Sequence, residues 1–276
     1  MKVIVTGASG FIGSRLVQEL LKRGIHTIPV SRKPINFPNS FIVDNYYDTP
    51  NGDILIHLAE NSNRYSVNQI GRPYLIEMKN LIDHLISKDY QRIVYASSVS
   101  VYNDQLKDLL KPHDPLDIRD TYSQSKINCE HIIKKTNGVI ARISNLYGHG
   151  MSENNVISTI IKQIHSGKID ILDDKPVRDF LWIEDAVNAL IKIALGKATG
   201  IFNVASGEAV SINELISKIL DKSGTDKKVK ILVSKPNKIV SIIKPDILDT
   251  FTSFGWKPKM KLENGINELL NKGITK

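Results

Sequence analysis

The chain begins with a short apolar run, and glycines follow at fixed intervals, Gly7, Gly10 and Gly13. The first glycine permits a sharp turn, the second removes a Cβ that would block a diphosphate, and the third allows a helix to pack closely on the strand. Apolar residues then recur at helical spacing as far as Gly24. This pattern predicts a dinucleotide site, because a helix N-terminus attracts phosphates. A structural glycine turn in another α/β domain is the alternative.

Apolar strands and amphipathic helices alternate over the first half of the chain. Strands are predicted at residues 26–30, 41–43, 53–58, 92–97 and 138–143, and helices from Pro73 and from Tyr122. Residues 60–72 are polar and are expected to be irregular. Since no hairpin signals separate the strands, the sequence predicts an α/β fold with a Rossmann-type, doubly wound parallel sheet.

The pattern changes after about residue 145. Helices are predicted at residues 155–165, 183–195, 211–220 and 262–270, and short strands at 169–172, 201–204 and 229–233. We expect no continuous sheet in this half. The interpretation is a Rossmann domain at residues 1–150, rejoined by a segment near 175–205, and a smaller interleaved α/β substrate lobe at residues 151–276.

Composition excludes several classes of protein. No apolar run reaches membrane-spanning length, and the chain enters its first strand at once, so we expect a cytoplasmic protein without a membrane partner. Cys129 is the only cysteine, and the histidines form no metal-binding cluster. The net charge is +8, but the lysines are scattered and not interleaved with aromatic residues, which favours a solvated surface over nucleic-acid binding.

The end of the second predicted strand bears on the choice of cofactor. Many dinucleotide folds place an acidic residue there to bind the adenosine ribose 2′-hydroxyl, whereas this chain has Ser31, Arg32 and Lys33. A guanidinium can bind a 2′-phosphate bidentately, so the sequence favours NADP, with NAD as the alternative. The basic residues could also simply begin a solvated loop.

Three polar residues form a candidate catalytic group. Tyr122 and Lys126 are four residues apart on a predicted helix and therefore share a face. An ammonium about 5 Å away favours the tyrosine phenolate by roughly 3 kcal/mol, which suits proton transfer to or from a carbonyl or hydroxyl oxygen. Ser98 ends a predicted strand and could hydrogen-bond the same oxygen. An ordinary exposed helix face is the alternative for the tyrosine–lysine pair alone.

Further motifs run to the end of the chain: HLA at residues 57–59, SSVSVY at 97–102, RISNLYG at 142–148, RDFLWIED at 178–185, FNVASG at 202–207 and FGW at 254–256. Together with the glycine turn and the candidate catalytic group, they make the chain resemble the extended short-chain dehydrogenases/reductases. The branch it resembles is the NAD(P)-dependent epimerase/dehydratase family, whose members act on nucleotide sugars.

The resemblance implies roles for particular residues. The implied catalytic residues are Ser98, Tyr122 and Lys126. The implied cofactor contacts are Gly7, Ser9, Gly10, Phe11, Ile12, Gly13, Ser31, Arg32, Asp44, Leu58, Ala59, Tyr122 and Lys126. The implied substrate contacts are Asn145, Arg178 and Lys235, with Arg178 on the diphosphate. A turn role for Asn145 and a surface ion pair for Arg178 are the alternatives, and no metal is expected.

Some positions depart from the family pattern. Val99 and Ser100 replace the Asp–Glu pair of 4,6-dehydratases, which argues against elimination of water. Lys235 stands where relatives often have arginine, and it would meet a phosphate only as a point charge. Tyr74 and Asn103 replace an asparagine and a glycine. These departures concern the substrate more than the chemistry.

The resulting hypothesis is an NAD(P)-dependent oxidoreductase acting at C4 of a nucleoside-diphosphate sugar, as a reductase of the 4-keto sugar. A 4-epimerase that retains NAD is the alternative within this class. A cofactor-sensing or RNA-binding protein without turnover is the alternative of another class. The resemblance also implies a homodimer.

Overall fold

The computed structural model describes residues 1–106, 108–224 and 229–274. A seven-stranded sheet forms its centre, with the order β10-β6-β5-β4-β1-β2-β3 and parallel pairing throughout. Its strands are β1 (Lys2–Thr6), β2 (His26–Ser31), β3 (Phe41–Ile42), β4 (Ile54–His57), β5 (Arg92–Ser98), β6 (Val139–Ile143) and β10 (Gly200–Val204). The order reverses between β1 and β4, and ligands of such sheets bind at the carboxyl ends beside that reversal.

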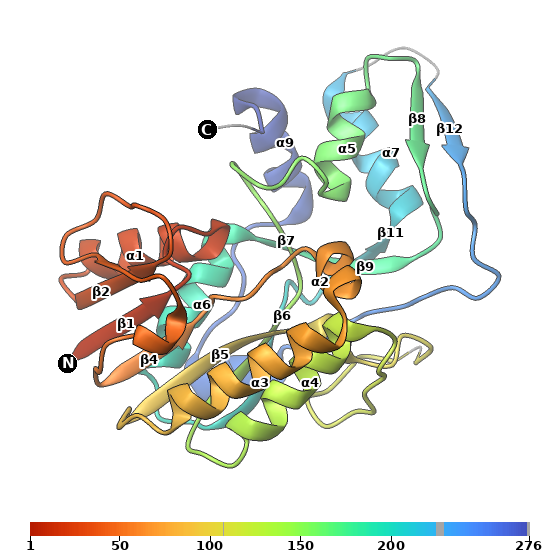
Figure 1. Ribbon diagram of the computed structural model, residues 1–276. Helices are drawn as coiled ribbons and strands as arrows, with labels where there is room; N and C mark the ends of the chain where they lie inside the picture. The colour runs from red at the N-terminus through yellow and green to blue at the C-terminus, as the bar shows by residue number, and fades with distance from the viewer. Residues whose placement is uncertain (107, 225–228, 275–276) are drawn as a thin grey trace.

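Helices cover both faces of this sheet (Figure 1). The helices α1 (Phe11–Lys22) and α6 (Ile183–Leu195) pack on one face, and α3 (Arg72–Ile86) and α4 (Thr121–Ile133) lie side by side on the other. The predicted Rossmann-type α/β fold is therefore confirmed.

The two cores follow from the alternation of side chains along each strand. Val3 and Val5 of β1 enter the core beneath α1 and α6, whereas Ile4 enters the core beneath α3 and α4. In β4, Ile56 enters the core beneath α1 and α6, and Leu55 enters the core beneath α3 and α4. Because both faces are covered, the central strands are mostly apolar and do not alternate regularly between apolar and polar residues.

The second half, where no continuous sheet was expected, contains two small and separate sheets. One has the order β11-β9-β7 and the other pairs β12 with β8. Their strands are β7 (Asn145–Tyr147), β8 (Lys168–Ile171), β9 (Val177–Trp182), β11 (Ala209–Ser211) and β12 (Lys230–Val233). A third core lies under α5 (Val156–Gln163), α7 (Ile212–Ser223) and α9 (Leu262–Lys272), and α8 (Leu248–Phe254) packs on β10. In Figure 1 the two small sheets and the helices α5, α7 and α9 stand beyond one end of the central strands.

The strand β9 was not predicted, because it opens with the charged pair Arg178 and Asp179. Asp179 is fully buried, and it accepts hydrogen bonds from the backbone N–H groups of Ser206 and Gly207 at 2.9 and 2.8 Å. Burial raises the pKa of this carboxyl although these hydrogen bonds oppose the rise. These partners come from a distant loop and leave no signal in the sequence near β9.

The segment 60–72 also differs from expectation, because it contains the helix α2 (Arg64–Ile70). The side chain of Asn63 caps this helix by accepting a hydrogen bond from Ser66 N–H at 3.0 Å. Gly71 has a φ of 68° and separates α2 from α3. Two 3₁₀ turns, Tyr46–Asp48 and Val99–Val101, complete the elements. Within the described ranges, no helix has the length and apolar content needed to cross a membrane.

Candidate active site

A cavity of about 440 Å³ opens over the carboxyl ends of the central strands, beside the reversal in strand order. It brings together most of the predicted residues of the glycine turn and all three predicted catalytic residues. Those that line it are Gly7, Gly10, Phe11, Ile12, Gly13, Leu58, Ser98, Tyr122, Lys126 and Asn145.

The glycine turn has the shape that a dinucleotide requires. Gly7 has a φ of 70°, and a Cβ there would lie 2.8 Å from the carbonyl oxygen of Leu58. A Cβ on Gly13 would lie 2.1 Å from the carbonyl oxygen of Gly7, so only glycine allows α1 to pack this closely. Gly10 is the exposed N-cap of α1 and provides no side-chain cap. No side chain caps the first turn, so its N–H groups could bind a diphosphate, which the turn fits.

The two candidate catalytic hydroxyls come from two neighbouring elements. Ser98 ends β5, and its Oγ donates a hydrogen bond to Ser100 Oγ at 2.9 Å and accepts one from Ser100 N–H at 3.2 Å. Tyr122 lies in the first turn of α4, and its backbone N–H donates to Asn68 Oδ1 at 3.1 Å. The side chain of Tyr122 is thus anchored at its base and faces the same cavity as Ser98.

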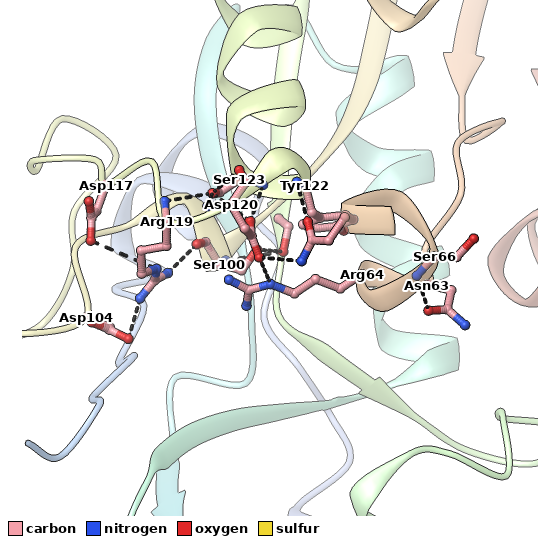
Figure 2. Close-up of polar contacts among 12 residues, drawn as sticks. Asn63, Arg64, Ser66, Ser100, Asp104, Asp117, Arg119, Asp120, Tyr122 and Ser123 are labelled. Carbon is pink, nitrogen blue, oxygen red and sulfur yellow. Dashed lines mark hydrogen bonds and ion pairs between the residues drawn. The ribbon is translucent and has the colours of Figure 1, made fainter. Parts of the chain in front are cut away.

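Asp120 fixes the start of α4 (Figure 2). Its carboxylate accepts a hydrogen bond from Ser123 N–H at 2.9 Å, forms an ion pair with Arg64 of α2, and accepts another hydrogen bond from Asn68 at 3.0 Å. Burial opposes ionisation of this carboxyl, but these hydrogen bonds outweigh it and lower its pKa to about 2. The helix that carries Tyr122 is therefore tied to α2 by a charged cap.

Lys126 has a partner that the sequence did not suggest. Its Nζ lies 2.9 Å from Glu60 Oε2, with the two side chains 7% and 5% exposed, and donates a hydrogen bond to Ala96 O at 2.8 Å. The same nitrogen is 5.9 Å from the ring centroid of Tyr122. Burial alone would raise the pKa of Glu60, but the charge of Lys126 outweighs it and lowers that pKa. Burial would lower the pKa of Lys126, but Glu60 reverses the effect and raises it.

A second cavity of about 180 Å³ adjoins the first, because Ser98, Ser144 and Asn145 line both. Arg64, Arg119 and Arg178 also line this second cavity, which we call the arginine cavity. Figure 2 shows two of these guanidiniums paired, Arg64 with Asp120 and Arg119 with Asp104.

Arg178 is held differently from the other two arginines. It donates hydrogen bonds to the hydroxyl and the carbonyl oxygen of Ser241, at 2.7 and 2.9 Å. Burial lowers the pKa of this guanidinium, and Asp104 opposes the change while Arg119 and Arg64 add to it. The arginine cavity therefore presents converging positive groups and suits an anionic ligand.

The remaining predicted residues lie outside both cavities. Ser31 is buried and accepts a hydrogen bond from Lys33 N–H at 3.0 Å, while Arg32 is exposed, with its guanidinium 5.5 Å from the Tyr46 ring centroid. Ser9 and Asp44 are exposed, and Ala59 follows Leu58 at the edge of the larger cavity. Lys235 is exposed beyond the end of β12, where its backbone N–H donates to Leu172 O at 2.8 Å, so the structure brings it to neither cavity.

Sequence reasoning missed Glu60, Arg64 and Arg119. The available signal for Glu60 was its place, since an acidic residue directly after the carboxyl end of a buried strand lies where ligands gather. Arg64 and Arg119 stood alone in segments expected to be irregular and gave no such signal. His57 is buried, with Nδ1 2.9 Å from Thr6 Oγ1.

The chain is similar over nearly its whole length to enzymes named for nucleotide sugars. The model of the NAD dependent epimerase/dehydratase family matches residues 3–205. A putative UDP-glucose 4-epimerase of Methanocaldococcus jannaschii is 29% identical over 98% of this chain and 97% of its own. The dTDP-4-dehydro-6-deoxyglucose reductase of Escherichia coli is 27% identical over 97% and 96%. UDP-glucuronic acid decarboxylase 6 of Arabidopsis thaliana is 26% identical over 96% and 87%.

A solved structure shares both the fold and this level of identity. MoeE5, solved in complex with UDP-glucuronic acid and NAD, superposes with a TM-score of 0.84 at 26% identity, covering 98% of each chain. These relatives carry out different reactions on nucleotide sugars. From the match over residues 3–205, the chain belongs to the NAD dependent epimerase/dehydratase family, whose members are nucleotide-sugar epimerases, decarboxylases and reductases.

Proposed function

We propose that the protein reduces the C4 keto group of a nucleoside-diphosphate sugar with a nicotinamide dinucleotide. The observation that carries this proposal is the convergence of Ser98, Tyr122 and Lys126 on one cavity beside the glycine turn. A hydroxyl, a phenol and an ammonium beside a dinucleotide site are the groups needed to exchange a carbonyl and an alcohol.

Each of these side chains has one task. The nicotinamide dinucleotide supplies the hydride when it is bound to the glycine turn. Tyr122 gives its phenolic proton to the C4 oxygen, and Ser98 hydrogen-bonds the same oxygen and orients it. Lys126 binds the ribose of the nicotinamide and stabilises the phenolate that Tyr122 becomes after the proton leaves.

The arginine cavity supports a nucleoside-diphosphate sugar as the substrate class. It adjoins Ser98, and Arg178 has guanidinium donors suited to phosphate oxygens. Asn145 lines both cavities and its amide donates to Asp179 O at 2.9 Å, so it stands where the sugar would pass from one to the other. We assign the diphosphate to Arg178 and leave Lys235 out of this site.

The choice of dinucleotide is also a proposal. Arg32 follows β2 and is exposed, which favours a 2′-phosphate and therefore NADP. NAD is the alternative dinucleotide, since MoeE5 was solved with NAD.

A 4-epimerase is the second candidate, favoured by the likeness to the putative UDP-glucose 4-epimerase. It would use the same three catalytic side chains but would retain NAD and return the hydride to the sugar. The cofactor-sensing or RNA-binding alternative is weaker, because catalytic side chains serve no purpose in it.

A single preparation separates these candidates. The purified protein is denatured to release and identify any bound dinucleotide, and fresh protein is then incubated with a 4-keto nucleotide sugar and NADPH or NADH. The reductase predicts stoichiometric loss of absorbance of the reduced nicotinamide, which Tyr122→Phe abolishes. Retained NAD with interconversion of C4 epimers and no net oxidation would contradict the reductase and support the epimerase.

A further inference from the structure

The carboxylate of Glu60 is buried in the larger cavity without enough partners. It lines the cavity with Lys126, and its side chain is 5% exposed. Its polar neighbours among the described residues are the Lys126 ammonium, 2.9 Å from Oε2, and the Tyr95 hydroxyl, which leaves acceptor positions of the carboxylate open. A buried ion pair stabilises a protein only weakly unless further hydrogen bonds satisfy it. The pair is therefore better explained by a ligand than by folding alone.

The surrounding structure holds Glu60 in this place. It follows β4 by three residues, and the next residue, Asn61, donates its backbone N–H to the Tyr74 hydroxyl of α3 at 3.2 Å. The titratable groups that face the pair are His57 of β4, Tyr95 of β5, Tyr74 of α3, and Tyr122 and Cys129 of α4. Burial lowers the pKa of His57 to about 4 and raises that of Cys129 to about 12. Near neutral pH these two groups are uncharged, so Glu60 is the carboxylate that balances Lys126.

The pair is complementary to a diol. A carboxylate only accepts hydrogen bonds and an ammonium only donates them, whereas each ribose hydroxyl does both. Carboxylates bind ribose hydroxyls in other dinucleotide sites for this reason. An acceptor beside a donor can thus hold two adjacent hydroxyls at once and fix which way the ring faces.

We propose that Glu60 binds the nicotinamide ribose together with Lys126, with its carboxylate accepting a hydrogen bond from a ribose hydroxyl. Glu60 thereby also holds the Lys126 ammonium beside Tyr122. This inference rests on the proposed function, because it requires a nicotinamide dinucleotide in the cavity.

Binding of whole and half dinucleotides tests the proposal without measuring turnover. NADH is titrated by its fluorescence against wild type, Glu60→Gln and the control Glu77→Gln, which removes an exposed carboxylate of α3. ADP, which lacks the nicotinamide ribose, is titrated calorimetrically as the half ligand of NADH. NADPH and its half ligand, adenosine 2′,5′-bisphosphate, are titrated in the same way. Glu60→Gln replaces the charged acceptor by a neutral one and leaves the buried Lys126 ammonium without its counter-charge, so dinucleotide binding should weaken roughly tenfold or more, whereas half-ligand binding should change less than about twofold.

Two outcomes would overturn the inference. Equal losses for the dinucleotide and its half ligand would mean that Glu60 only shapes the cavity, and unchanged dinucleotide binding would mean that it touches no ligand. Glu60→Ala repeats the test if the glutamine variant is unstable, and retained half-ligand binding certifies its fold. A wild type that binds neither dinucleotide would instead refute the proposed function, so the two failures are distinct.

Discussion

Asp120 and Arg64 join the helices α4 and α2 beside the arginine cavity, which Arg64 lines. Asp120 caps α4, which carries Tyr122 and Lys126, and its ion pair with Arg64 ties that cap to α2. Arg64 lies in the polar segment 60–72, which was expected to be irregular. The order of α2 and the placement of Tyr122 are therefore linked through one carboxylate.

Removing this carboxylate should loosen the start of α4. Asp120→Ala loses both the cap and the ion pair, and we expect a loss of about 1–2 kcal/mol in the free energy of unfolding. Asp120→Asn keeps a capping oxygen and loses only the charge, so it should cost less. Urea unfolding of both variants checks this order, and equal losses would show that the cap contributes little.

His57 should make stability depend on pH. Burial lowers its pKa to about 4, whereas an unfolded histidine titrates near about 6.5. Between these values the unfolded chain binds the proton more readily, so this contribution is fully present above about pH 6.5 and is lost as the pH falls toward 4. The contribution of His57 changes the free energy of unfolding by at most about 1.4 kcal/mol per pH unit.

The measurement is the free energy of unfolding in urea at several pH values across this window, for wild type and His57→Gln. The variant should show a shallower decline than the wild type as the pH falls. Parallel declines in the two proteins would assign the pH dependence to other groups.

Substitutions at Gly13 and at Gly10 should impair different properties, stability in the first case and dinucleotide binding in the second. Gly13→Ala places a Cβ 2.1 Å from the Gly7 carbonyl oxygen, so the variant should unfold at a lower temperature. Gly10→Ala meets that oxygen at 3.1 Å, with an ordinary φ of −81°, and should keep most of its stability.

Dinucleotide binding gives the second readout for these variants. Gly10→Ala should nevertheless bind dinucleotide far more weakly, because its methyl group occupies the approach to the helix N-terminus. Thermal melting and NADH titration on the same samples separate the two effects. Normal binding by Gly10→Ala would place the phosphates elsewhere.

Arg178 should matter for the substrate, and Lys235 should not. Arg178→Lys keeps the charge but loses the planar set of donors, and we expect KM for the nucleotide sugar to rise roughly tenfold or more. Lys235→Ala removes an exposed charge outside both cavities and should change KM less than about twofold. Steady-state kinetics decide the matter, and a larger effect from Lys235 would move the diphosphate away from the arginine cavity.

Local patterns account for what the sequence predicted well. The turn from Gly7 to Gly13 and the apolar central strands are each encoded within a few residues, and the structure contains both. Ser98, Tyr122 and Lys126 could be proposed together because their spacing and motifs are also local.

What the sequence did not predict depends on contacts between distant segments. The strand β9 begins with charges that are satisfied only by a loop near residue 206, and β7 spans just three residues. Glu60 forms an ion pair with Lys126, and Arg64 forms one with Asp120. The two residues of each pair are more than fifty positions apart in the chain. The spacing of apolar residues along the chain does not predict such pairs.

The strand β9 ends at Trp182, and α6 starts at the next residue. Arg178 therefore sits on the same continuous stretch as a helix that packs against α1, the helix that begins at the glycine turn. The segment that carries the proposed diphosphate contact and the segment that carries the glycine turn therefore meet in one packed helix layer, α6 against α1.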